Sequence, residues 1–163
     1  MQITATSECA LQVLMTLARH SDGPLSSERI ADLGAVPRGS LENALSALRR
    51  GGLVASQRGV HGGFRLAVPA DEVTVAHVLR LTDGPLLMVR QYLPEELVYD
   101  AGSAVLQRLW FATRASLRHV YEQVTISDLI ADSLCARVAA LATDHDASVA
   151  RPESVTAVHR LRR

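Results

Sequence analysis

The stretch that decides the fold is residues 37–68, which read PRGSLENALSALRRGGLVASQRGVHGGFRLAV. After a proline suited to a first helical turn, apolar residues recur at the i, i+3, i+4 and i+7 spacing of a helix: Leu41, Ala44, Leu45 and Leu48. Gly51-Gly52 supplies a left-handed stop. Two short apolar segments, 53–56 and 64–68, then flank a glycine-rich loop, which is typical of a β-hairpin. The stretch therefore predicts a helix followed directly by a hairpin.

Two further helices are predicted ahead of this stretch. Residues 3–20 repeat apolar side chains at helical spacing and contain neither Gly nor Pro. After a break at residues 21–24, a short helix is expected over 25–31, with Ser26 as its N-cap. Three helices followed by a hairpin, with a short turn between the second and the third, form the arrangement of a winged helix-turn-helix domain. Small modules of this order also serve in protein interaction, so DNA binding and protein interaction both remain open on the pattern alone.

The second half of the chain is predicted to be helical and to meet a partner subunit. A fourth helix is expected over 74–82 with Thr74 as its N-cap, and the apolar run 86–89 suits a strand. Residues 103–124 predict a long helix whose apolar seam steps by four and three residues, close to the repeat of paired helices. A second apolar edge on this helix leads us to expect one stripe against its own domain and one against a partner. The predicted dimerisation seam is Leu106, Trp110, Thr113, Leu117, Val120 and Val124.

The chain is expected to end in one more helix and a tail. A capping box at 125–128 predicts a last helix that continues through Leu134 and Val138. The predicted fold is mainly α with a small β-hairpin wing. Its predicted parts are a winged helix-turn-helix DNA-binding domain over 1–84, a linker and dimerisation helices over 85–142, and a flexible C-terminal tail over 143–163.

Composition narrows the class of protein. The chain has 163 residues, no lysine, and 17 basic against 17 acidic residues. The absence of lysine excludes a Schiff-base lysine and a P-loop, and no catalytic arrangement follows from the spacing of the other residues, so we expect no enzyme. No apolar run reaches the ~18 residues of a membrane span and no signal-peptide pattern opens the chain, so we expect a cytoplasmic protein without a membrane partner. Cys9 and Cys135 are expected to be buried structural thiols.

The zero net charge conceals a basic segment. From Arg38 to Arg65 there are five arginines and one acid, a balance of +4, whereas residues 69–163 balance at −2. Arg58 stands beside a loop with three glycines, and such a loop can approach a minor groove closely. The outward positions of the predicted third helix carry residue types that can address base edges: Arg38, Ser40, Glu42, Asn43 and Ser46. We therefore hypothesise that this segment reads DNA.

Several motifs of the chain occur together in one known family. They are Glu8-Cys9-Ala10-Leu11, Leu48-Arg49-Arg50-Gly51-Gly52-Leu53-Val54, the wing pattern Arg58-Gly59-x-x-Gly62-Gly63-Phe64-x-Leu66-Ala67, and Asp83-Gly84-Pro85-Leu86. In these motifs, from Met1 to about Leu134, the sequence strongly resembles the Rrf2 family of bacterial transcription regulators. The resemblance implies a homodimeric winged-helix regulator, with a repressor favoured over an activator, that binds a palindromic operator in double-stranded DNA.

The resemblance also implies a role for individual residues. The third helix would enter the major groove through Arg38, Ser40, Glu42 and Asn43, and the wing would place Arg58 in the minor groove. Ser26, Ser27 and Arg49 would hold phosphates, and His61 of the wing loop joins the predicted DNA-binding set.

One departure from the family concerns its cofactor. Many members carry three cysteines after the Asp-Gly-Pro-Leu element, and these hold an iron–sulfur cluster. Here residues 87–102 contain no cysteine and offer only Glu95, Glu96 and Asp100, and Glu8 adds a single further ligand. We therefore expect no cofactor and no metal, and we expect control either by a small ligand in the cleft between the fourth helix and the long dimerisation helix or by a protein partner. Two alternatives stay open: a cluster-bound redox or nitric-oxide sensor with unusual ligands, and a winged-helix protein-interaction adaptor.

Overall fold

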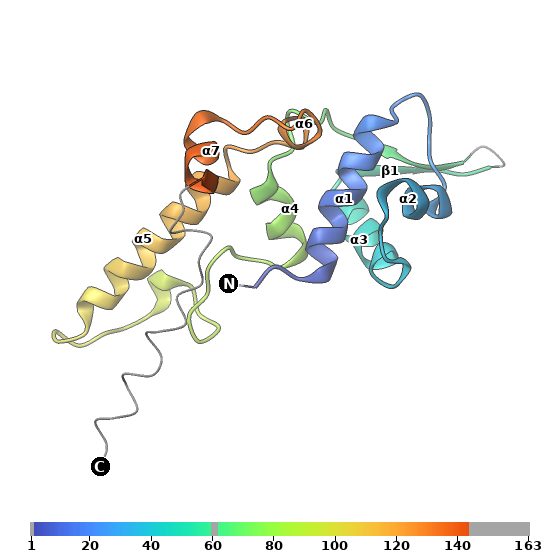
Figure 1. The fold of residues 1–163 in the computed structure, drawn as a ribbon. Helices are drawn as coiled ribbons and strands as arrows, with labels where there is room; N and C mark the ends of the chain where they lie inside the picture. Colours follow the sequence, from blue (N-terminus) through green and yellow to red (C-terminus); the bar gives the residue numbers. More distant parts are fainter. Residues whose placement is uncertain (1, 60–61, 144–163) are drawn as a thin grey trace, which may run out of the picture. The chain divides into compact units, whose positions relative to one another are not determined.

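The computed structural model describes residues 2–59 and 62–143. The chain divides into two compact units, Met1–Ser133 and Leu134–Arg163, and each is described by itself. The first unit contains α1 (Ala5–Arg19), α2 (Ser27–Gly34), α3 (Arg38–Arg50), β1 (Val54–Gln57), β2 (Gly63–Leu66), α4 (Val75–Thr82), the 3₁₀ helix η1 (Pro94–Glu96), α5 (Ala104–Tyr121) and α6 (Ile126–Ile130). The second unit contains α7 (Ala136–Thr143). Three helices, a hairpin and a long later helix confirm the predicted, mainly α fold with a small wing (Figure 1).

Four helices begin at a Ser or Thr whose hydroxyl accepts a backbone N–H of the first turn. Ser26, Thr74 and Thr125 do so as predicted, with oxygen-to-nitrogen distances of 3.2, 3.2 and 3.1 Å. Thr4 caps α1 in the same way at 3.2 Å. The Asp128 carboxylate accepts the backbone N–H of Thr125 at 2.8 Å, which completes the predicted capping box. Such a cap contributes about 1 kcal/mol, so the local sequence fixes where these helices begin.

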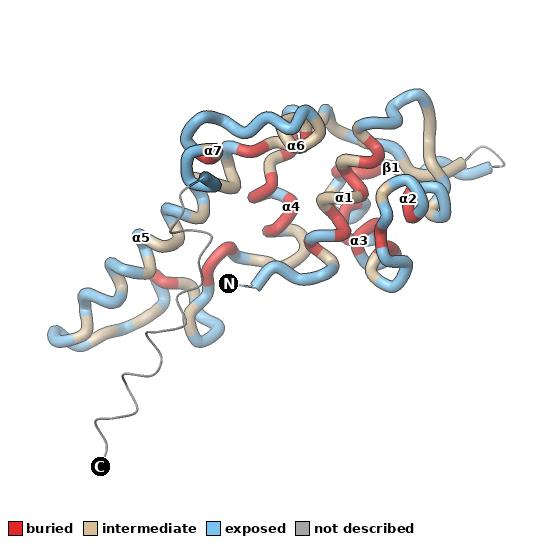
Figure 2. The backbone as a smooth tube through the Cα atoms, in the orientation of Figure 1, coloured by how far each residue is buried: buried red, intermediate tan, exposed pale blue. Residues whose placement is uncertain are grey.

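The core of the first unit lies between its first three helices. Leu14 of α1, Ile30 of α2 and Leu48 of α3 are fully buried and belong to one cluster. Figure 2 shows this burial along the helices that pack together, α1, α3 and α4. Cys9 is part of the same core, and its burial raises the pKa of the thiol to about 11, which confirms the predicted buried thiol. Cys135 is exposed, so the same prediction was wrong for it; among the described residues of its unit only Val138 is buried.

The wing is an antiparallel hairpin that also pairs with the segment ahead of α2. Within the hairpin, Val54 faces Leu66 and Gln57 faces Gly63. Leu25 and Phe64 then exchange two backbone hydrogen bonds, of 2.9 and 2.8 Å, and so attach the hairpin to the start of the second helix. A Cβ atom at Gly63 would overlap the backbone of Leu25 and of the residue after it. Only glycine therefore permits this close approach.

A polar network joins the start of α1 to the end of α4. The Thr4 hydroxyl donates to an Asp83 carboxylate oxygen at 2.7 Å, and the hydroxyls of Ser7 and Thr82 lie 2.5 Å apart. Burial would raise the pKa of Asp83, but hydrogen bonds from Ser7 and Thr4 outweigh it and hold this pKa below the usual value. Because Ser7 is completely buried, the network is a fixed part of the packing between these two helices.

Two predicted elements differ from the structure. The helix expected to run from 125–128 through Val138 is two helices, because α6 ends at Ile130 and the chain turns at Asp132, where φ is +50°. The expected strand at 86–89 is absent from the described chain; Val89 forms only an isolated bridge with Tyr92 around two residues of positive φ. In both places a local turn, supported by its own backbone hydrogen bonds, replaces the longer element.

The long helix α5 packs lightly on its own unit. It contacts α4 and η1, and the Trp110 indole N–H donates to the Tyr99 hydroxyl at 2.9 Å. Every residue of this helix is described, and none of them is buried. Its exposed apolar side chains include Val105, Leu106 and Leu109, with exposed fractions of 56, 39 and 51%. Among all the helices that the structure describes, none is long and apolar enough to span a membrane.

We expect Gly63→Ala to lower the free energy of unfolding by about 2–3 kcal/mol, because the added methyl group displaces the backbone of Leu25 and breaks the pairing with Phe64. Urea denaturation followed by circular dichroism measures the change. Gly39→Ala is the control, since a Cβ there meets nothing within 4 Å and the position is helical. Equal stability of the two variants would show that the wing does not depend on the close approach.

Candidate nucleic-acid interface

The outer face of α3 presents the residues that the sequence analysis assigned to it. Leu41, Ala44, Leu45, Ala47 and Leu48 are buried against the core. Arg38, Glu42, Asn43 and Ser46 are exposed, and Ser40 is half-buried. The helix thus has one apolar and one polar face, as its spacing predicted, and the polar face can meet a partner without loss of core contacts.

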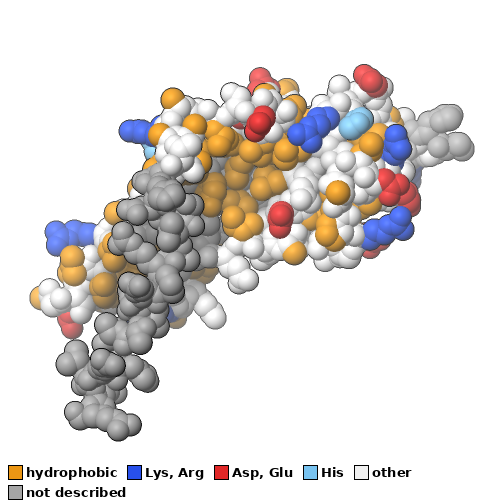
Figure 3. All heavy atoms as spheres, viewed as in Figure 1, with side chains coloured by type: hydrophobic (Ala, Val, Ile, Leu, Met, Phe, Trp, Pro, Cys, Tyr) orange, Lys and Arg blue, Asp and Glu red, His pale blue; other side chains and the backbone are white. Residues whose placement is uncertain are grey.

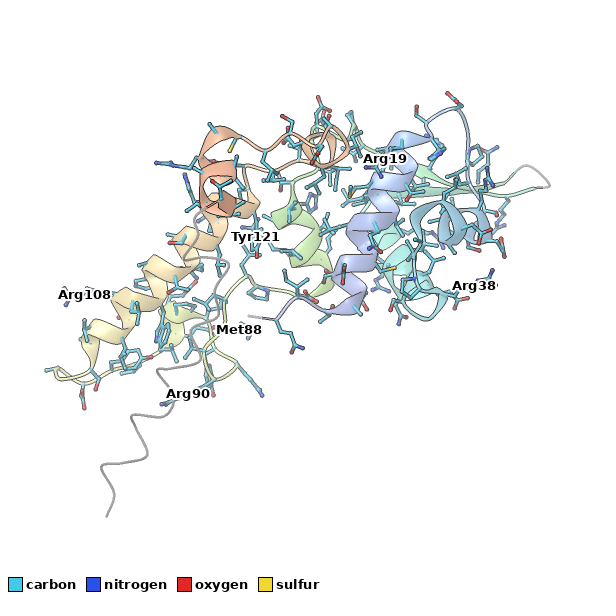
Figure 4. All side chains as sticks on the ribbon, viewed as in Figure 1. Arg19, Arg38, Met88, Arg90, Arg108 and Tyr121 are labelled. Carbon is cyan, nitrogen blue, oxygen red and sulfur yellow. The ribbon has the colours of Figure 1, made fainter. Side chains whose placement is uncertain are left out.

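Arg38 begins this polar face. Its guanidinium lies 4.0 Å from the Asp32 carboxylate, and the two side chains are 78 and 65% exposed. A pair this open and this long contributes little, so Arg38 keeps its donors for another partner. Figure 4 shows Arg38 at the outer end of these helices, pointing away from the domain.

The two serines at the start of α2 are less suited to phosphate than the sequence suggests. The Ser26 hydroxyl is already the cap of the helix, and it also hydrogen-bonds Glu28. Hydrogen bonds from its own backbone amide and from Ser26 hold the pKa of Glu28 below its usual value, so this carboxylate is charged. Glu28 and Ser27 line one shallow hollow of about 210 Å³ together with Arg38 and Glu42. A phosphate in this hollow would meet two carboxylates, and the roles of Ser26 and Ser27 in phosphate binding stay predictions.

A second hollow, of about 480 Å³, lies between α3 and β1 and is basic. Ser46, Arg49, Arg50, Val54 and Ser56 line it. The Arg50 guanidinium donates to the Ser46 hydroxyl at 2.9 Å, which orients it along the helix. Sequence reasoning selected Arg49 and left out Arg50 and Ser56. The spacing of Ser46 and Arg50, four residues apart on one helix, was the available signal for Arg50.

The wing adds two further arginines. Arg58 is exposed directly after β1, and Arg65 is exposed on β2 opposite Ala55. The turn is held by a hydrogen bond of 2.9 Å from the Gly62 N–H to the Gly59 carbonyl. His61, the remaining predicted contact, lies outside the described residues. We refer to the exposed arginines of α3 and of the hairpin together as the basic face: Arg38, Arg49, Arg50, Arg58 and Arg65.

Comparison with known proteins shows the family to which the chain belongs. Residues 3–132 match the model of the Rrf2 family, described as an iron-dependent transcriptional regulator. The chain belongs to the Rrf2 family. It is 36% identical over 148 residues to Rv1287 of Mycobacterium tuberculosis, named as an HTH-type transcriptional regulator, covering 90% of this chain and 92% of the relative. It is 32% identical over 130 residues to the HTH-type transcriptional regulator CymR of Bacillus subtilis, covering 79 and 89%.

Solved structures support the same placement. The structure of CymR, the global cysteine regulator of B. subtilis, matches with a TM-score of 0.68 and 28% identity over 82% of this chain and 98% of that one. The structure of T. potens IscR matches with a TM-score of 0.64 and 26% identity, over 81 and 88%. The prediction of an Rrf2-type, DNA-binding transcriptional regulator is thereby confirmed, and the relatives are regulators rather than enzymes.

The Rrf2 description as iron-dependent calls for a ligand set, which this chain does not supply where the cysteines of many members stand. Each acid there is engaged elsewhere: Glu95 pairs with Arg114 at 2.5 Å, Glu96 accepts the backbone N–H of Leu93 at 2.7 Å, and Asp100 accepts the backbone N–H of Ser103 at 2.8 Å. Within residues 2–59 and 62–143 no three His, Cys, Asp or Glu side chains gather as metal ligands would. The described residues at this place in the chain therefore do not fit an iron–sulfur cluster.

Proposed function

We propose that this protein acts as a homodimeric, cytoplasmic repressor that binds a palindromic operator without an iron–sulfur cluster. The observation that carries the proposal is the basic face, in which five arginines of α3 and of the hairpin are exposed, together with the Leu25–Phe64 pairing that attaches the hairpin to the segment ahead of α2. Arginine binds both phosphate oxygens and guanine edges through paired donors.

In this proposal the start of α3, the end of α3 and the wing have different tasks. Arg38, Glu42 and Asn43 lie at the start of α3 and address bases in the major groove. Arg49 and Arg50, at the end of the helix, bind the phosphate backbone, which fixes orientation without reading sequence. Arg58 enters the minor groove from the wing, where narrow A·T tracts have the most negative potential.

The homodimer is proposed because α5 exposes apolar side chains and buries none. Of the predicted seam, Leu106 is exposed, while Trp110, Thr113, Leu117 and Val120 are half-buried against the protomer and Val124 is buried. The most exposed apolar positions, Val105 and Leu109, belong to the second apolar edge of the helix. We therefore place the partner on the stripe through Val105, Leu106 and Leu109. Two α5 helices paired across a two-fold axis relate two winged-helix domains by the same symmetry, as the two half-sites of a palindromic operator require.

We expect Arg49→Ala to weaken binding to all DNA alike and to reduce the slope of log affinity against log salt by about 1, because it removes a phosphate contact. Arg58→Ala is expected to weaken binding chiefly to sites with a narrow A·T minor groove. Fluorescence anisotropy with operators selected from a random pool measures both effects. Arg19→Ala, at the exposed end of α1, is the matched control and should leave affinity unchanged. Unaltered binding by both test variants would reject the docking scheme, and a wild-type protein that selects no operator would favour an adaptor.

For the dimer, Leu109→Asp is expected to give monomers in sedimentation velocity, since a charge would be buried in the pair of helices. The side chain is 51% exposed in the protomer, so the substitution leaves the fold intact, as circular dichroism can verify. Val98→Asp is the control, because Val98 is 96% exposed and lies outside α5. A Leu109→Asp variant that retains the dimer mass would refute this stripe as the interface.

Protein purified under anaerobic conditions after reconstitution with iron and sulfide is expected to lack visible absorbance and stoichiometric iron, because residues 87–102 provide no thiolate. Iron and acid-labile sulfide assays, together with the absorption spectrum, measure this. The control is the same preparation with its operator affinity measured before and after the treatment, which should agree. Stable binding of iron and sulfide in fixed ratio would overturn the cluster-free proposal.

A further inference from the structure

A further hollow of the first unit shares no lining residue with the basic face. It is about 580 Å³ in volume and is formed by α4, the loop that follows it, η1 and α5. Three of its lining residues are arginines: Arg80 of α4, and Arg114 and Arg118 of α5. Sequence reasoning assigned these residues no task, and the proposed DNA contacts do not use them.

The charges around this hollow do not balance. Arg114 donates to Glu95 at 2.5 Å. Arg80 and Arg118 both donate to the same carboxylate oxygen of Glu122, at 2.5 and 3.0 Å. Three guanidinium groups therefore meet two carboxylates, which leaves an excess of one positive charge. Each guanidinium carries five N–H donors, and these ion pairs use one donor of each, so most donors remain for a bound anion.

The three arginines are held in place by neighbouring side chains, so their positions do not depend on a bound ligand. Arg114 is the least exposed of them at 29%, and its guanidinium lies over the Phe111 ring, 5.6 Å from the centroid. Arg80 and Arg118 approach from two helices and are bridged by Glu122, so their guanidinium groups stay close together. Hydrogen bonds from Arg80 and Arg118 hold the pKa of Glu122 below its usual range, so this bridge is charged at neutral pH. A cationic site with positions fixed before binding loses little entropy when an anion arrives.

The rest of the lining is apolar. Pro85, Leu86 and Leu93 form part of the wall, and Leu86 is itself buried. Such a wall can cover a short carbon body while arginines hold its charged end, which is the usual composition of a small-molecule site. We propose that this hollow, through Arg80, Arg114 and Arg118, binds a small organic anion that bears a carboxylate or a phosphate group and regulates the protein.

The polar network between α1 and α4 provides a route from this site to the basic face. Gly84 and Pro85 line the hollow and directly follow Asp83, which accepts hydrogen bonds from Thr4. Ser7, near the start of α1, is linked to Thr82, at the end of α4. α1 in turn packs on α3, so an anion that moves the end of α4 acts on the helix that carries Arg38. This regulatory part of the inference rests on the proposed function, whereas anion binding does not.

Isothermal titration calorimetry of the full chain, at constant ionic strength in chloride, tests the site with succinate, inorganic phosphate and uncharged succinamide. We expect saturable binding of at least one of the two anions and none of succinamide; the anion that binds tells a carboxylate ligand from a phosphate ligand. Arg114→Gln should weaken that binding at least about tenfold, because it removes a charged and partly buried donor. Arg108→Gln is the matched control on the same helix; its side chain does not line the hollow, and Figure 4 shows where it lies.

A variant that gains affinity guards against loss through misfolding. Glu95→Gln releases Arg114 from its carboxylate partner, and we expect it to tighten anion binding about threefold, which damage to the fold cannot imitate. Absence of saturable binding by both anions, or equal loss in Arg114→Gln and Arg108→Gln, would overturn the inference. Operator binding by the same preparations separates the two claims. Anion binding without operator binding would refute the proposed function alone, and operator binding without anion binding would refute this site alone.

Discussion

The pairing of Leu25 with Phe64 is the contact on which the rest of the winged helix-turn-helix domain depends. Two short backbone hydrogen bonds join the segment ahead of α2 to the hairpin, and they form only because Gly63 has no side chain to keep the two backbones apart. A two-stranded hairpin alone is marginal in water, and this third backbone segment gives it a fixed neighbour. The relative position of α3 and the wing, and therefore of Arg49 and Arg58, follows from that attachment.

How much of this the sequence could predict varied with the range of the interactions involved. The apolar spacing of α3 and the hydroxyl caps Ser26, Thr74 and Thr125 are local signals, and the structure confirms the helices that they predict. The Leu25–Phe64 pairing joins residues far apart in the chain, and no periodicity announces it. The break after Ile130 was missed for a different reason. The apolar spacing continues through Val138, while the turn needs a positive φ at Asp132, which aspartate tolerates without a glycine to mark it in the sequence.

The candidate sites show the same division. Periodicity correctly placed the outward residues of α3, because the direction of a helical side chain depends only on its position in the helix. It could not show that Ser26 is occupied as a cap and as a partner of Glu28, or that Arg50 joins Arg49 in one hollow. The cleft between the fourth helix and the long helix was predicted as a possible ligand site, but its lining by Arg80, Arg114 and Arg118 was not, because an irregular loop separates α4 from α5 in the chain. Figure 3 shows apolar side chains gathered over α4 on one face of the molecule. The acids at 95, 96 and 100 lie in the same segment, and each already makes an ion pair or a hydrogen bond that stabilises its local structure.

Cys9 lies in the core of the winged helix-turn-helix domain, in the same cluster as buried residues of α1 and α3. Oxidants and alkylating agents react with the thiolate form of cysteine, and with a pKa of about 11 only about one Cys9 side chain in ten thousand is ionised at neutral pH. The buried and protonated thiol therefore reacts slowly with peroxide in the surrounding solution. Chemical modification of Cys9 requires that the packing of the first three helices open first. The rate of modification therefore measures how often the folded domain opens transiently.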